Sequence, residues 1–291
     1  MPMRTWSFTK GHGTENDFVL LLDPEGTLPV GPAEVRHLCD RHAGVGGDGL
    51  LRAVRAGHVE DWTGDPSLWF MDYRNADGSV AEMCGNGVRV FARFLLENGQ
   101  VAGPVVPVAT RDGVKEATVL PDARVRVAMG PVRVAAPEDV VTVTTADGRQ
   151  FQARPADVGN PHAVSFVDDL EPLPLGVAPG YPAERFPAGV NLEFVRLLGP
   201  RHVAMRVHER GVGETRSCGT GTVAVAAAAR AHAGDRAPLP VTYRVDVPGG
   251  SVDVELTDDQ AYLTGPAVLV ASGTVQVPER QGGVEQGPEE G

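Results

Sequence analysis

Two cysteines of this chain head nearly identical segments. Cys84 opens CGNG before the run VRVFARFLL, and Cys218, 134 residues later (218 − 84), opens CGTG before TVAVAAAA. Each segment is typical of a thiol at a helix N-terminus, where free backbone N–H groups and the helix dipole favour a thiolate and an anionic ligand. Two such helix ends facing each other would hold one carboxylate between two thiols. One sulfur could then remove a proton while the other supplies one from the opposite side, which is racemase or epimerase chemistry.

A catalytic thiol needs help to ionise. Bringing a cysteine pKa from about 8.5 to about 7 takes roughly 2 kcal/mol, of which a helix N-terminus supplies about 0.3 to 2 kcal/mol. His162 in GNPH and Glu209 in HERGVGET are candidate helpers, although a lone acid or histidine is more often structural. The alternative for both thiols is that they are small buried residues beside turn glycines. Cys39 is interpreted as a core residue of a predicted helix.

Further polar and glycine residues are candidates for binding a ligand. Glycines beside the thiols would let backbone N–H groups approach a carboxylate, or serve turn geometry alone. These are Gly85, Gly87, Gly219 and Gly221. A set of amides and one guanidinium, each a turn or cap residue by default, could together bind a second, distant amino acid head group. These are Asn16, Asn75, Asn160, Asn191 and Arg210.

Composition limits the classes of function. The chain has 291 residues, 42% of them hydrophobic, and a formal charge of −12, which opposes nucleic acid or anionic lipid as a partner. Its three cysteines include no CxxC pair, so neither a disulfide framework nor a metal site is expected. The contexts of Lys10 and Lys115 do not suggest a pyridoxal Schiff base, so we expect no cofactor. No membrane span or secretory signal is recognisable, which predicts a cytoplasmic protein acting on a small molecule.

Strands are expected to outnumber helices. Short β-branched runs predict strands over Phe18–Leu22, Val125–Met129, Val203–Val207, Val241–Val247 and Val252–Leu256. One helix should follow Pro32, with Val35, Leu38, Cys39 and His42 on one face. A second is predicted from about Gly87 to Asn98, and a third, buried helix from near Gly219. Residues 171–188 are interpreted as a long surface loop, and residues 279–291 as a disordered tail.

Six motifs, in order, resemble the diaminopimelate epimerase family: KGHGTENDFVLL, RHAGVGGDGLL, NADGSVAEMCGNGVRVFARF, VGNPHAVSFV, GVNLEFV and VHERGVGETRSCGTGT. They span Lys10 to about Thr222, and LTGPAVLV is similar to the family's last strand. The resemblance implies an α+β fold of two pseudo-symmetric lobes, each a curled mixed β-sheet, or barrel-like roll, around a central helix. The active site would lie in the cleft between them. The expected lobes are residues 1–131, completed by strand 266–278, and residues 132–265.

The resemblance also implies an isomerase that interconverts LL- and meso-2,6-diaminopimelate in lysine and peptidoglycan biosynthesis without pyridoxal phosphate. Cys84 and Cys218 match the two acid/base residues, and His162 and Glu209 match the positions that tune the thiols. Backbone groups of four residues are expected at the reacting carboxylate: Gly85, Asn86, Gly219 and Thr220. The asparagines and Arg210 match substrate-binding positions. Four positions depart from the usual pattern: Gly49 replaces a common Gln, Thr14-Glu15 replaces Leu-Gly, and Arg74 replaces an aromatic residue.

Two rival functions stay open on the sequence. A related two-thiol racemase acting on proline or hydroxyproline would use the same cysteines, but its substrate lacks the distant head group that the asparagines and Arg210 suit. A non-catalytic redox sensor would use Cys84 and Cys218 as a reversible disulfide switch. It would leave the glycines beside the thiols unexplained. The sequence leaves a homodimer open.

Overall fold

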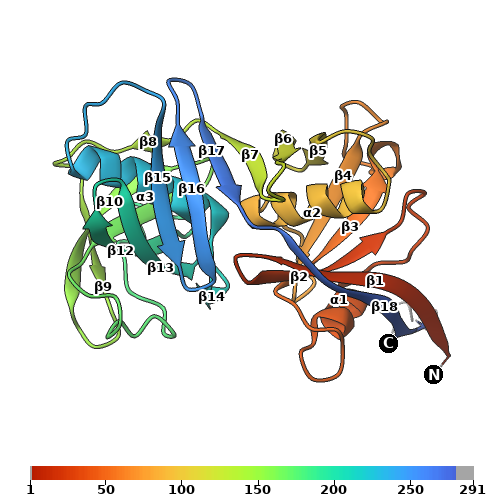
Figure 1. Cartoon of the computed structure of the whole chain (residues 1–291). Coiled ribbons are helices and arrows are strands. Elements are labelled where there is room, and N and C mark those ends of the chain that lie inside the picture. Colours follow the sequence, from red (N-terminus) through yellow and green to blue (C-terminus); the bar gives the residue numbers. More distant parts are fainter. Residues whose placement is uncertain (1, 280–291) are drawn as a thin grey trace, which may run out of the picture.

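The computed structural model describes residues 2–279. Of the tail predicted over residues 279–291, only Glu279 lies within this range, and its backbone N–H donates to the Pro2 carbonyl at 2.9 Å. The rest of the predicted tail lies outside the described residues. Within them, the chain forms a mostly β structure with three α-helices, arranged as two lobes (Figure 1).

The first lobe, drawn from red to yellow in Figure 1, begins with a hairpin and encloses α2. Its elements are β1 (Met3–Gly13), β2 (Asn16–Leu22), α1 (Pro32–Cys39), β3 (Gly49–Arg55), the 3-10 helix η1 (Ala56–His58), β4 (Trp69–Asn75), α2 (Gly85–Glu97), β5 (Val105–Thr110), β6 (Gly113–Val119) and β7 (Val125–Gly130).

The second lobe, drawn from green to blue, encloses α3. Its elements are β8 (Arg133–Val134), β9 (Val141–Thr144), β10 (Gln150–Asp157), β11 (Pro161–Phe166), β12 (Asn191–Gly199), β13 (His202–Glu209), β14 (Gly213–Thr215), α3 (Gly219–His232), β15 (Val241–Val247), β16 (Gly250–Leu256) and β17 (Ala261–Gly265). The last strand, β18 (Val268–Pro278), returns to the first lobe and pairs with β1 (Figure 1).

The two lobes repeat one topology. In the first, β2 runs parallel to β3, β3 antiparallel to β4, and β4 parallel to β5 after α2. In the second, β11, β12, β13 and β15 repeat this order around α3. The strand register aligns Phe18 with His162 and Gly49 with Asn191, because Phe18 pairs with Gly49 and His162 with Asn191. The repetition seen in the sequence around the two cysteines is therefore part of a repetition of structure.

Each lobe curls around a buried helix. In α3, an alanine-rich sequence with high helix propensity, every residue from Gly219 to Ala229 is buried, as predicted for a helix that is apolar on all sides. In α2, Val88, Phe91 and Leu95 are fully buried, and the helix stops before Gly99, whose φ of +67° suits a glycine. Both helices pack into one large apolar core with strands of both lobes.

Two sequence predictions were wrong in detail. Helix α1 ends at Cys39, so His42 lies beyond it, with its side chain 99% exposed. Residues 171–188 do form a loop, but Leu173, Leu175 and Phe186 of this loop are buried in a second apolar cluster. Separately, no helix within residues 2–279 has the length and apolar character needed to cross a membrane.

Candidate active site

A cavity of about 720 Å³ lies between the lobes and contains both predicted thiols. All predicted site residues line it except Asn86, His162, Gly87 and Gly221, which are buried. Those that line it are Asn16, Asn75, Cys84, Gly85, Asn160, Asn191, Glu209, Arg210, Cys218, Gly219 and Thr220. Residues that are far apart in the sequence are thus brought to one surface. No group of three or more His, Cys, Asp or Glu side chains within residues 2–279 could hold a metal ion.

The N-termini of α2 and α3 meet at this cavity. Cys84 and Cys218 are the N-cap residues of the two helices. A Cβ placed on Gly219 would lie 3.1 Å from the Gly85 Cα and 3.2 Å from the Asn86 nitrogen, so this approach requires glycine at position 219. Because both helix dipoles direct their positive ends here, the site has a preformed preference for an anion.

The Cys84 thiol is held between a backbone donor and an amide acceptor. Its sulfur accepts a hydrogen bond from the Gly87 N–H at 3.4 Å and donates to Asn16 Oδ1 at 3.6 Å. Asn16 Nδ2 donates to Asp48 Oδ2 at 2.8 Å, and a carboxylate can only accept, so Asp48 turns the amide oxygen of Asn16 toward the thiol. Burial raises the pKa of the Cys84 thiol to about 11, against the opposing effect of the Gly87 N–H.

The Cys218 thiol lies against a carboxyl group. Burial is the largest cause that holds its pKa well above the usual range, and the negative charges of Glu209 and Glu193 add to it. Burial also raises the pKa of Glu209, while hydrogen bonds from the Thr215 hydroxyl and the Cys218 thiol oppose the shift. Glu209 therefore has direct contact with one thiol and an elevated affinity for a proton, two properties of a proton-relay group.

The His162 side chain lies behind the wall of the cavity. Its Nδ1 lies 2.6 Å from Glu193 Oε1, and both side chains are completely buried. Its Nε2 lies 2.9 Å from Asn160 Oδ1, and Asn160 Nδ2 donates to the Thr220 hydroxyl at 3.4 Å. Burial raises the pKa of Glu193, whereas the adjacent His162 lowers it. His162 thus orients Asn160 at the cavity surface.

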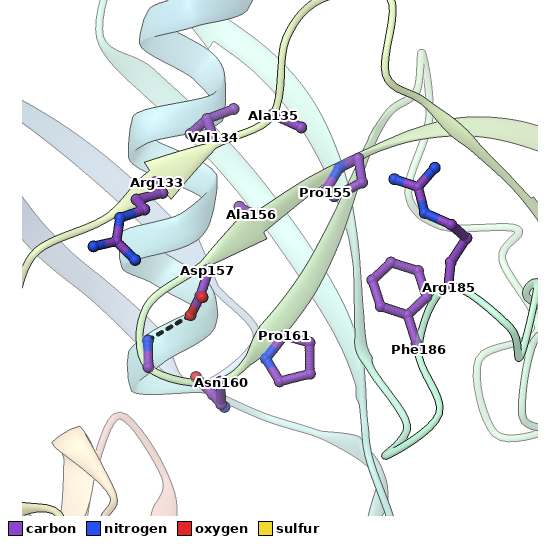
Figure 2. Close-up of a pocket in the computed structure, with 11 residues that line it drawn as sticks. Arg133, Val134, Ala135, Pro155, Ala156, Asp157, Asn160, Pro161, Arg185 and Phe186 are labelled. Carbon is purple, nitrogen blue, oxygen red and sulfur yellow. Dashed lines mark hydrogen bonds between the residues drawn. The ribbon is translucent and has the colours of Figure 1, made fainter.

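The turn that presents Asn160 also borders a second cavity, of about 440 Å³ (Figure 2). Asp157 Oδ1 accepts a hydrogen bond from the Gly159 N–H at 2.7 Å, drawn as the dashed line in Figure 2. Gly159 has φ of +89°, a conformation that favours glycine. This turn holds Asn160 between the two cavities, with its side chain bonded to His162 and Thr220 on the active-site side.

Asn86 joins the lobes. Its Nδ2 donates to Asn16 Oδ1 at 3.2 Å and to the Ser217 carbonyl at 3.0 Å. The side chain is therefore committed to contacts between the two thiol-bearing segments. Its Oδ1 is buried with no hydrogen-bond partner among residues 2–279, and a backbone contact between Asn86 and a substrate carboxylate stays a prediction.

The lining of the cavity also includes an amide and a cation. Asn191 Oδ1 accepts from the Arg210 backbone N–H at 3.0 Å, and Asn191 Nδ2 donates to the Pro161 carbonyl at 3.2 Å. The Arg210 guanidinium donates to the Ala188 carbonyl at 2.9 Å, and no carboxylate within residues 2–279 lies at ion-pair distance. A guanidinium so placed, with donors to spare, suits a ligand carboxylate.

The two thiols have unequal surroundings. The shared register aligns Asn75 with Glu209, because Leu50 pairs with Arg74 as Leu192 pairs with His208. It also places Leu51 of the first lobe where Glu193 stands in the second. Glu209, His162 and Glu193 all come from the second lobe. Buried titratable groups are thus concentrated on the Cys218 side of the cavity.

Sequence reasoning missed Glu193 and Asp48. Glu193 interrupts the apolar run VNLEFV within a strand, and a lone acid among buried positions is a signal of a specific partner. Asp48 gave no such signal, since it lies in a glycine-rich loop where Asp is common. Its role depends on Asn16, which is 32 residues away.

Gly49 is explained by its neighbours. A Cβ at this position would lie 2.6 Å from the Arg74 carbonyl and 2.8 Å from Tyr73 Cε2. Tyr73 lines the cavity and packs edge-on against Phe18. The tyrosine ring therefore fills the space beside position 49, where a side chain from β3 would otherwise extend.

We expect Gly49→Gln to destabilise the fold by about 1–3 kcal/mol, because the new side chain must displace Tyr73 or the β4 backbone. Urea unfolding of the purified variant measures the loss. Gly103→Gln is the matched control, since nothing lies within 4 Å of a Cβ at Gly103. Equal stabilities for the two variants would contradict the packing argument.

The chain matches the family model described as Diaminopimelate epimerase over residues 8–135 and 155–270. It is 54% identical over 275 residues to the diaminopimelate epimerase of Streptomyces coelicolor, covering 92% of this chain and 94% of that protein. It is 49% identical over 283 residues to that of Corynebacterium glutamicum, covering 94% and 99%.

Solved structures share the fold at low identity. A PhzF-family phenazine biosynthesis protein from Bacillus anthracis gives a TM-score of 0.67 at 14% identity, covering 94% of this chain and 99% of that one. A hydroxyproline epimerase from Agrobacterium vitis, solved with trans-4-hydroxy-L-proline bound, gives 0.66 at 18%, covering 94% and 93%. At these identities the likeness concerns the two-lobed architecture alone.

Proposed function

The chain belongs to the diaminopimelate epimerase family, a family of isomerases, and on that basis we propose that it interconverts LL- and meso-2,6-diaminopimelate through Cys84 and Cys218. The observation that carries the mechanism is the pair of N-cap thiols at facing helix ends in one cavity. The activity serves lysine and peptidoglycan precursor biosynthesis.

The reaction begins with the substrate carboxylate bound at the two helix N-termini. Backbone N–H groups from Gly85, Asn86, Gly219 and Thr220 are the expected donors. One thiolate removes the α-proton, and the opposite thiol delivers its own proton to the other face of the carbon. The positive helix ends are fixed before the reaction begins, so they stabilise the negative charge that develops on the α-carbon and carboxylate.

The side chains beside each thiol set its protonation. Asn16 accepts from the Cys84 S–H, which favours the thiol form, while the Gly87 N–H favours the thiolate. On the other side, Glu209 accepts the proton of Cys218 when that thiol must ionise and returns it later. His162 and Glu193 keep Asn160 in place. The site can then hold one thiolate and one thiol at the start of either direction of epimerisation.

The distant amino acid head group fits the other end of the cavity. Arg210 would bind its carboxylate, and the amides of Asn75, Asn160 and Asn191 would bind its ammonium and carboxylate groups. Proline and hydroxyproline have no group that could reach these residues. This end of the cavity favours diaminopimelate over the ring substrates.

The elevated thiol pKa predicts a rate that rises with pH. A base with pKa about 11 in the empty site is mostly protonated at neutral pH. Each step toward higher pH then increases the thiolate fraction, by at most about tenfold per pH unit. We expect kcat/KM for LL-diaminopimelate to rise from pH 7 to pH 9 while circular dichroism stays constant. A rate that is flat or falls over this range would contradict a buried thiolate base.

The direct test is an assay with LL-diaminopimelate, L-proline and trans-4-hydroxy-L-proline in parallel, read by chiral chromatography. In D₂O, the product should gain one deuterium at the inverted carbon. Turnover of diaminopimelate alone supports the proposal. Turnover of a ring substrate alone would favour the racemase alternative. No turnover, together with a reversible Cys84–Cys218 disulfide, would favour the redox sensor.

Three further expectations stay predictions. The pathway assignment favours a cytoplasmic location, and a homodimer stays open to a sedimentation measurement. The lobe boundaries, residues 1–131 with 266–278 and residues 132–265, are our proposal for the folding units. In support, β18 pairs with β1 along its length.

A further inference from the structure

Arg89 is a buried cation that the mechanism above does not use. It lies in α2, one turn beyond Cys84. Among the described residues, it is the largest residue with a fully buried side chain, at 0% exposure. Its Nε donates to the Pro266 carbonyl at 3.3 Å and its Nη2 to the Thr14 hydroxyl at 3.2 Å. Its Nη1 is buried and has no hydrogen-bond partner.

Among residues 2–279, no carboxylate forms an ion pair with the guanidinium. The β1–β2 turn contributes Gly13 and Thr14, and the segment after β17 contributes Gly265 and Pro266. A Cβ on Gly13 would lie 2.9 Å from Nη2, so the backbone leaves room for this group. The nearby Glu15 instead pairs with Arg216 at the surface. Cys84 is the ionisable neighbour whose charge affects the pKa of Arg89, which burial lowers to about 10.

Such an arrangement is costly for the fold. Moving an ammonium- or guanidinium-sized ion out of water carries an effective penalty of several kcal/mol, and apolar residues of equal volume are often as good or better for stability. Packing alone therefore does not account for a cation here. A buried charge without an oppositely charged partner, close to a reactive group, is a feature of functional sites.

The position of Arg89 also connects it to both lobes. Thr14, which accepts from Nη2, donates to the Ser217 hydroxyl at 2.7 Å, and Ser217 directly precedes Cys218. Thr14 has φ of +49°, which is strained for a β-branched residue. The strained turn at Thr14 is therefore held by two hydrogen bonds. One comes from the Arg89 guanidinium, and the other goes to Ser217, next to Cys218.

We propose that Arg89 supplies the fixed positive charge that balances the Cys84 thiolate, and that it is a positioning residue for the reaction and not a structural one. The inference rests on the proposed function, because it assigns the charge to the same site. A full cation adds to the partial charges of the two helix ends. Its unpaired Nη1 and the lack of an ion-pair partner among residues 2–279 leave its positive charge uncompensated by the part of the chain that the structure describes.

The test measures Cys84 directly. In Arg89→Met, loss of the cation should raise the pKa of Cys84, so iodoacetamide should alkylate Cys84 about threefold to tenfold more slowly at pH 8.5. Peptide mass spectrometry separates Cys84 from Cys39 and Cys218. Arg89→Lys keeps the charge and should stay within about twofold of the wild type. Turnover of diaminopimelate by Arg89→Met should fall about tenfold in kcat.

Arg93→Met is the matched control, since Arg93 lies one turn further along α2 and pairs with Glu97. It should leave Cys84 alkylation unchanged. An unchanged alkylation rate in folded Arg89→Met would overturn the proposal. So would failure of Arg89→Met to fold, because the cation would then serve the structure. If the wild type does not epimerise diaminopimelate but the alkylation rates differ as expected, the function is wrong and the role of Arg89 stands.

Discussion

We expect alanine at either Cys84 or Cys218 to abolish epimerisation in both directions, with kcat reduced at least about 10³-fold. Each sulfur serves one face of the stereocentre, so the remaining thiol can remove a proton but cannot return one to the opposite face. Both side chains lie in the same cavity at helix N-caps, and the change from sulfur to hydrogen leaves the backbone donors in place. The measurement is the rate of meso-diaminopimelate formation from the LL isomer, and the reverse.

Cys39→Ala is the control for thiol loss as such. Cys39 lies on α1 among Val35, Leu38 and other apolar residues, and burial raises its pKa to about 12. We expect unchanged kcat/KM and a stability loss of about 1 kcal/mol. Full activity in Cys84→Ala or Cys218→Ala would refute the two-thiol mechanism, whereas loss of activity in Cys39→Ala would implicate an indirect effect of folding.

Glu209→Gln should reduce kcat by about 10²- to 10³-fold, the usual contribution of a positioned acid/base group. Glutamine keeps the size and the hydrogen bond from Thr215, but it cannot take a proton from Cys218. The same change removes a negative charge that raises the pKa of both thiols. Alkylation of Cys84 and Cys218 should therefore become faster as turnover becomes slower.

Slower turnover together with faster alkylation distinguishes the loss of a proton-relay group from a structural defect. Glu214→Gln is the matched control, because Glu214 pairs with Arg206 at 2.7 Å and does not line the cavity. Both its turnover and its alkylation rates should match the wild type. If Glu209→Gln slows turnover and alkylation together, Glu209 supports the fold of the site. If it changes neither, the relay is absent.

Local patterns in the sequence predicted the parts of the site that depend on nearby residues. The glycines after each cysteine indicated two helix N-termini, and α2 and α3 begin at Gly85 and Gly219. The alanine-rich run predicted a buried helix, and β15 spans Val241–Val247 as its alternating residues indicated. Helix caps, periodicity and glycine conformation are set within a few residues, so one sequence is enough to reveal them.

Partners across the fold could not be predicted in this way. Nothing near Asp48 indicates that it turns the amide of Asn16, and nothing near Arg89 indicates that its guanidinium would be enclosed by Gly13 and Pro266. Arg89 resembled one more cation in an amphipathic helix. Such contacts depend on strand register between distant segments, which a hydrophobic pattern does not specify.

The pairing of β1 with β18 has a consequence for biosynthesis of the protein. The ladder joins Met3 to Pro278 at one end and His12 to Val268 at the other, so β1 finds its neighbour only after the whole second lobe has been translated. The strands β8 to β16 come from one uninterrupted stretch of chain. On the ribosome, the half that carries Cys218 can therefore mature while the half that carries Cys84 still has an open edge, and assembly of the cleft waits for the synthesis of β18.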